Sequence, residues 1–108
     1  MMASLAKATM LSNSDVEILC SWNGEAKEEG RIDNQSGYTF RIEERIPYHF
    51  SSNMNSLASK AKGKLILFIN DDLFLDPGSI DAGIECLQSN DQAGLVGGKL
   101  RNEINQLE

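Results

Sequence analysis

The stretch "LILFINDDLFLDPGS" at residues 65–79 places an uninterrupted apolar run directly before Asn70 and two adjacent aspartates, Asp71 and Asp72. A strand with one solvent-facing side alternates apolar and polar residues, and this run does not. We therefore expect "KLILFIN" at 64–70 to form a central parallel strand that is covered on both faces. Ligands of open α/β sheets bind beyond the carboxyl ends of the strands, so the acidic pair lies where a site is expected.

The segments on either side alternate between strand and helix patterns. The pattern predicts further strands at 16–20, 38–46 and 93–98, and helices at 2–12, 50–63 and from residue 76 to about residue 89. This order predicts an α/β fold with a mostly parallel sheet and flanking helices. We expect Ser51 or Ser52 to cap the second helix, and Asp76 followed by Pro77 to start the third.

Composition limits the classes of protein that the chain can represent. With 108 residues it is one domain at most, and its net charge of −6 argues against nucleic acid as a partner. No run approaches the roughly 18 apolar residues of a membrane span, so no transmembrane segment is expected. Cys20 and Cys86 are the only cysteines, and we expect them to be buried free thiols of a cytoplasmic protein.

The spacing of the acidic residues suits a cation. In an extended chain Asn70 and Asp72 point one way and Asp71 the other. Two carboxylates about 4 Å apart repel by on the order of 4 kcal/mol at an effective dielectric of about 20, and a divalent cation or opposite orientations relieve this. Mg²⁺ and Mn²⁺ are commonly held by one or two carboxylates together with substrate phosphates. A plain turn made by the two aspartates is the alternative.

Residues 47–100 resemble the central part of the family 2 inverting glycosyltransferases, which have the GT-A fold. The matching pieces are a helix with Asn55, "AKG" ending at Gly63, an apolar strand ending "NDD", a helix started by Pro77, and "GLVGGKL" at 94–100. The "PYHFSSNMN" segment is most like the subgroup that builds O-antigen and other cell-surface polysaccharides. The resemblance implies a Rossmann-like fold that binds a nucleotide-diphospho-sugar.

The resemblance also implies roles for single residues. Asn70-Asp71-Asp72 stands where the family has its DXD-like motif, so Asp72 would bind Mn²⁺ or Mg²⁺ at the donor diphosphate and Asp71 would lie near the ribose. Asn70 and Asn55 would contact the nucleotide-sugar donor, whose sugar passes to a glycan acceptor. Where the family has an aspartate that contacts the base, this chain has Trp22, which either stacks on the base or packs against the protein.

By the same resemblance, residues 1–108 form a single, partial domain. The family's first strand would precede residue 2, and the acceptor half with the catalytic base would follow residue 108, so no catalytic residue is assigned. We expect activity in the full-length enzyme, in the cytoplasm or at the inner face of the membrane, and not in the fragment alone. An absent first strand would expose a sheet edge, and we expect a homodimer through that edge.

Two other classes compete with this interpretation. A receiver-like signalling domain also places acidic residues after an apolar strand, but there the pair follows the first strand. A non-catalytic α/β interaction domain is the other alternative. His49 is expected to lie in a loop or to be partly buried, and Asn53, on the same predicted helix as Asn55, suits a solvated position as well as a donor site.

Overall fold

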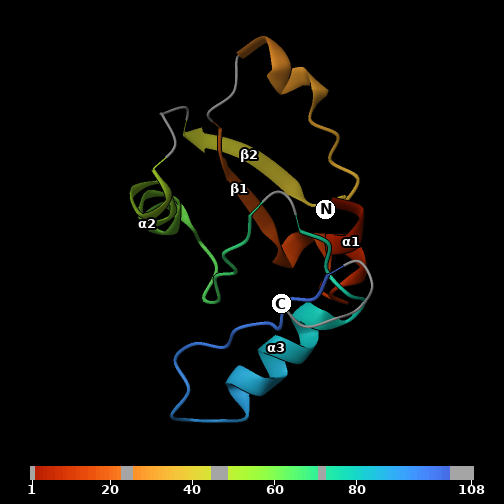
Figure 1. The fold of residues 1–108 in the computed structure, drawn as a ribbon, viewed down its shortest axis with the longest axis vertical. Coiled ribbons are helices and arrows are strands. Elements are labelled where there is room, and N and C mark those ends of the chain that lie inside the picture. The colour runs from red at the N-terminus through yellow and green to blue at the C-terminus, as the bar shows by residue number, and fades with distance from the viewer. Residues whose placement is uncertain (1, 23–25, 45–48, 71–72, 103–108) are drawn as a thin grey trace.

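The computed structural model describes residues 2–22, 26–44, 49–70 and 73–102, and within them it contains two strands, with short helices before and between them and two longer helices after them (Figure 1). The elements are α1 (Met2–Lys7), the 3-10 helix η1 (Asn13–Asp15), β1 (Glu17–Ser21), the 3-10 helix η2 (Ala26–Arg31), β2 (Thr39–Glu44), α2 (Phe50–Lys60) and α3 (Ser79–Gln88).

The sheet of the described residues consists of β1 and β2, which pair in parallel. Ile18 lies opposite Phe40 and Cys20 opposite Ile42, and the register shifts after Cys20. β-branched and aromatic residues favour such half-buried strands. The parallel pair with flanking helices confirms an α/β arrangement, and it confirms the strands predicted at 16–20 and 38–46 over their described residues.

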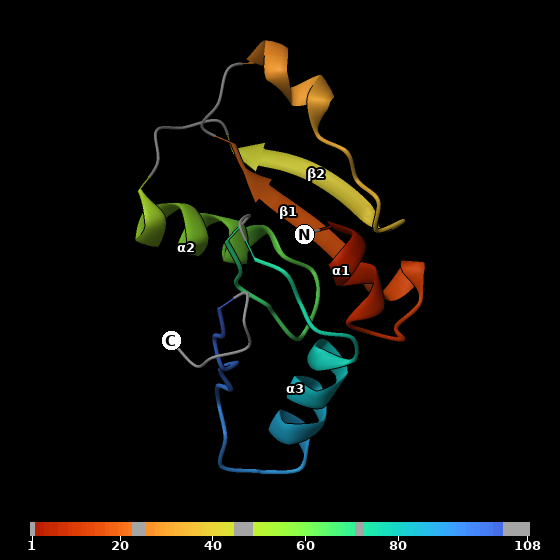
Figure 2. The ribbon, with the colours of Figure 1, turned by 45° about the vertical axis from the view of Figure 1, so that its right-hand side comes forward.

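Helix α2 lies against the sheet (Figure 2). Its buried residues are Asn53 and Leu57, which are one helical turn apart and therefore share a face. The other end of the helix is tied to β2, because the Lys60 ammonium donates to the Glu43 carbonyl oxygen at 3.1 Å. The N-cap position belongs to the exposed His49, so the cap predicted at Ser51 or Ser52 is wrong.

The carboxyl end of α1 meets the amino end of α3. The backbone N–H of Gly78 donates to the Lys7 carbonyl oxygen at 3.0 Å, and that of Ile80 donates to the Ala8 carbonyl oxygen at 2.9 Å. The carbonyls at the end of a helix have no partner within it. Here the carbonyl oxygens of Lys7 and of Ala8, which directly follows α1, accept hydrogen bonds from residues at the start of α3. Helix α1 accordingly ends at Lys7, several residues before the end predicted for the 2–12 pattern.

A side chain closes the same junction. The Asp81 carboxylate in the first turn of α3 accepts hydrogen bonds from the Thr9 hydroxyl at 2.5 Å and from the Met10 N–H at 2.8 Å. The Leu75 N–H donates to the Ser4 hydroxyl at 3.1 Å. Residues 75–81 are thus fixed to the N-terminal segment by several polar contacts, which we call the α1–α3 junction.

A turn precedes α3. The Ser79 N–H donates to the Asp76 carbonyl oxygen at 3.0 Å, and Gly78 has a φ of 75°, in the left-handed region that favours glycine. The helix therefore begins at Ser79, and the prediction that Asp76 caps it with Pro77 in its first position is wrong. The helical spacing predicted up to about residue 89 is confirmed.

The apolar core of the described residues is small. It consists of Leu5, Ala8, Tyr38 and Leu57. Neither the half-buried Cys20 nor the exposed Cys86 forms a disulfide, as predicted. The predicted burial is wrong for Cys86 and is met only in part by Cys20. Among the helices of the described residues, none is long and apolar enough to cross a membrane.

The apolar run after α2 is not a strand in this structure. Residues 65–68 are each 45–53% exposed, and residues 93–98, with Leu95 85% exposed, are irregular as well. The strands predicted at 64–70 and 93–98 are therefore wrong. A run that is apolar on both faces becomes a central strand only where neighbouring strands pair with it, and the sheet formed by the described residues has β1 and β2 alone.

Candidate functional site

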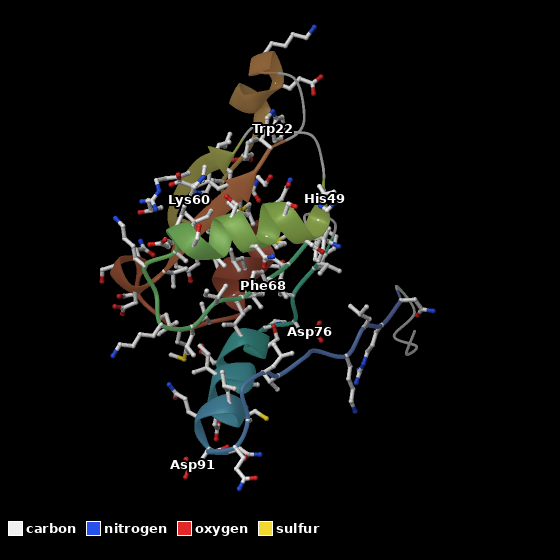
Figure 3. All side chains as sticks on the ribbon, turned by 90° about the vertical axis from the view of Figure 1, so that its left-hand side faces the viewer. Trp22, His49, Lys60, Phe68, Asp76 and Asp91 are labelled. Atoms are coloured by element: carbon white, nitrogen blue, oxygen red, sulfur yellow. The ribbon has the colours of Figure 1, made fainter. Side chains whose placement is uncertain are left out.

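Asn70 ends the apolar segment and is the described member of the Asn70-Asp71-Asp72 motif. It is exposed and lines a shallow, open hollow of about 140 Å³ with Phe50, Phe68, Ile69 and Leu73. Figure 3 shows Phe68 on the side of α2 that faces α3, and His49 at the start of α2. The hollow thus joins the amino end of α2 to the residues that flank the acidic pair.

Asp71 and Asp72 lie outside the described residues, so their predicted roles at the ribose and at a metal stay predictions. Among the residues that the structure describes, no group of three or more His, Cys, Asp or Glu side chains could hold a metal ion. A site of the predicted kind does not need such a group, because one or two carboxylates and the phosphates of a ligand suffice for Mg²⁺.

Trp22 directly follows β1 and is half-buried. In Figure 3 it lies near the end of β1. The half-burial is compatible with either of the two roles open to it, packing against the protein or stacking on a base. It does not line the hollow that contains Asn70.

The two asparagines of α2 differ sharply. Asn55 is exposed, whereas Asn53 is 3% exposed and its amide nitrogen donates to the Ser21 hydroxyl at 2.7 Å. The Asn53 amide oxygen is buried and has no hydrogen-bond partner. Leaving such an acceptor unsatisfied costs about 1–3 kcal/mol, so an N–H or O–H group that reached this oxygen would be bound favourably.

The family resemblance implies Asn55 for the site that binds the nucleotide-sugar, whereas the sequence leaves Asn53 open between that site and a solvated position. The structure places Asn53, rather than Asn55, at the carboxyl end of β1. No hydrogen bond among the described residues joins Asn55 to Asn70. A signal was available in the sequence. Asn53 precedes Leu57 by four residues, and the apolar Leu57 marks the buried face of the helix.

A second, wider hollow lies beside α3. It has a volume of about 470 Å³, is open to solvent, and is lined by Leu11, Asp81, Ile84, Glu85, Gln88 and Ser89. The Asp81 carboxylate is already engaged by Thr9 and Met10. The Asp81 carboxylate is therefore not available to a ligand in this hollow. The polar groups that remain are exposed side chains of α3 and of Ser89, which follows it.

The sequence matches no protein-family model, and neither a curated protein nor a solved structure matches it.

Proposed function

We propose that the chain is part of a family 2-like inverting glycosyltransferase of the GT-A fold, and that it binds a nucleotide-sugar donor whose sugar passes to a cell-surface glycan. The proposal rests on one observation, the sequence Asn70-Asp71-Asp72 between an apolar run and a Pro-initiated turn into a helix. The parallel β1–β2 pair, with α2 against it, is the kind of scaffold on which such a site is built.

In this proposal Asp72 holds Mn²⁺ or Mg²⁺ and Asp71 lies near the ribose. The donor set fits a hard cation, since it consists of carboxylate oxygens, the Asn70 amide and the phosphates of the ligand. When bound, the cation stabilises the charge that develops on the departing nucleoside diphosphate. The protein then works in the cytoplasm or at the inner face of the membrane, where nucleotide sugars are the donors.

The polar residues near the carboxyl end of β1 supply further contacts to the donor. Trp22 offers an aromatic face to the base. Asn53 lies at this end of β1, and in this proposal its amide oxygen, which is buried and lacks a partner, accepts a hydrogen bond from the nucleotide-sugar once binding of the nucleotide-sugar uncovers that oxygen.

Calorimetric titration of uridine diphosphate with and without Mn²⁺ tests the acidic motif. Binding should require Mn²⁺, and Asp72→Ala should weaken it at least about tenfold, because the cation loses a charged ligand. Asp91→Ala removes the same charge from an exposed position beyond α3 and should leave the affinity unchanged. Metal-independent binding, or equal losses in the two variants, would contradict the proposal.

The two asparagines permit a second, matched comparison. Asn53→Ala should lower the affinity for uridine diphosphate more than Asn55→Ala does, because only Asn53 places an unpartnered acceptor at the end of β1. The opposite order would favour the residue that the family resemblance implies.

One observation also favours a non-catalytic function. Leu65, Ile66, Leu67 and Phe68 are each about half-exposed, as expected of a surface that binds another chain. If neither uridine diphosphate nor another nucleoside diphosphate binds the full-length protein, and acetyl phosphate does not label it, both the transferase and the receiver-like function are contradicted, and an interaction domain is the function that remains.

A further inference from the structure

The apolar segment 65–70 has an unusual combination of properties. No hydrogen bond joins its backbone to another described residue, and residues 66–70 contain neither a turn nor a bend. The side chains of residues 65–68 are all exposed to nearly the same degree, between 45% and 53%. The segment thus presents a row of unpaired N–H and C=O groups together with β-branched and aromatic side chains.

Unpaired backbone groups favour one kind of partner. A groove for a helix needs only apolar side chains, but a row of free N–H and C=O groups is satisfied by an added strand. Such an exposed row invites pairing with another chain, and cross-strand contacts between apolar side chains stabilise the pair.

The charges on either side identify the partner strand. Lys62 and Lys64 precede the apolar residues in the sequence, and Asp71 and Asp72 follow them. An antiparallel copy of the same segment brings the basic end of each chain beside the acidic end of the other. A parallel copy would instead bring like charges together, which destabilises a strand pair.

We propose that segment 65–70 is a strand-addition site for a second copy of this chain, paired antiparallel about a twofold axis near Leu67. Such an interface is isologous, since each copy gives and receives the same contacts. Lys64 of one copy then lies near Asn70 of the other. The pairing also covers the surface of residues 65–68 that stays exposed within one chain, about half of each residue.

Sedimentation velocity over a concentration series from about 1 μM to about 1 mM tests the proposal, because small interfaces dissociate within this range. The wild-type chain should change from monomer to dimer as the concentration rises. Leu67→Lys should weaken dimerisation at least about tenfold, since it places two ammonium groups at the centre of the interface. Segment 65–70 has no backbone hydrogen bond to another described residue that the substitution could break, so the far-UV circular dichroism of the variant should be unchanged.

Phe74→Lys is the matched control, because Phe74 is 85% exposed, apolar and outside the segment, and this variant should dimerise as the wild type does. Lys64→Glu should also weaken the dimer, whereas Lys99→Glu makes the same charge change on another exposed segment and should have no effect. A monomer at every concentration overturns the proposal. So does a dimer that survives Leu67→Lys, or one that Phe74→Lys disrupts equally.

Discussion

In the α1–α3 junction, the N–H groups of Gly78, Ile80 and Asp81 donate to the carbonyl oxygens of Lys7 and Ala8 at the end of α1. In segment 65–70, by contrast, no backbone group bonds to a described residue. The junction joins residues as far apart in sequence as Thr9 and Asp81. Segment 65–70 is far more apolar, yet its side chains are about half-exposed. Directional hydrogen bonds select one arrangement of two segments, whereas an apolar run gains free energy from burial against any apolar surface and selects none by itself.

The largest expected effect comes from comparing a leucine in each region. Leu5 in α1 is 6% exposed, so Leu5→Ala should lower the free energy of unfolding by about 2–4 kcal/mol through lost burial and a residual cavity. Leu67 is 53% exposed, and Leu67→Ala should cost less than about 1 kcal/mol. Urea unfolding of the dilute proteins, followed by circular dichroism, measures both. Equal losses would mean that segment 65–70 is as well packed as the junction.

The side-chain hydrogen bonds of the junction should have an intermediate effect. Asp81→Ala removes the acceptor of the Thr9 hydroxyl and of the Met10 N–H and should cost about 1–2 kcal/mol, with water replacing part of the loss at the exposed Met10. Asp91→Ala is the control, because it removes the same charge where no described residue donates a hydrogen bond to the carboxylate. The same urea unfolding measures the difference, and a cost for Asp91→Ala as large as that for Asp81→Ala would contradict it.

The smallest expected effect concerns the turn that delivers residues 78–81 to α1. Gly78 has a φ of 75°, so Gly78→Ala should cost about 1 kcal/mol through backbone strain alone, because an added Cβ would meet no atom within 4 Å. Gly94→Ala also meets no neighbour, and its φ lies outside the left-handed region, so it should be close to neutral. Thermal unfolding of the two variants tests this, and identical midpoints would show that the turn is not strained.

What the sequence predicted well depends on local patterns. The strand at 16–20 was predictable from a short, partly β-branched apolar run, and the helix within 50–63 from the residues typical of helix ends; both are signals carried by neighbouring residues. The strand predicted at 64–70 failed because pairing depends on which segments lie beside it, and hydrophobicity does not encode that. The junction was not predictable at all, since its contacts join short polar groups 71 or 72 residues apart.

The candidate site likewise has one part that the sequence shows and one part that only the structure shows. The acidic motif at 70–72 is a sequence feature, and its assignment still rests on sequence and on resemblance. The buried Asn53, by contrast, needed the structure, because only the packing of α2 against β1 shows which asparagine faces inward. Helical spacing relative to Leu57 would have favoured the same residue.

Hydrogen–deuterium exchange at two protein concentrations tests the central contrast most directly. We expect the N–H groups of Gly78 and Ile80 to exchange slowly at both concentrations, because the carbonyl oxygens of Lys7 and Ala8 accept their hydrogen bonds. The N–H groups of residues 67–70 should exchange without protection in the dilute monomer and become protected in the concentrated protein, when a second copy adds its strand. Protection of residues 67–70 in the dilute monomer would contradict the account, because it would mean that the segment pairs within its own chain, as its apolar pattern alone predicts.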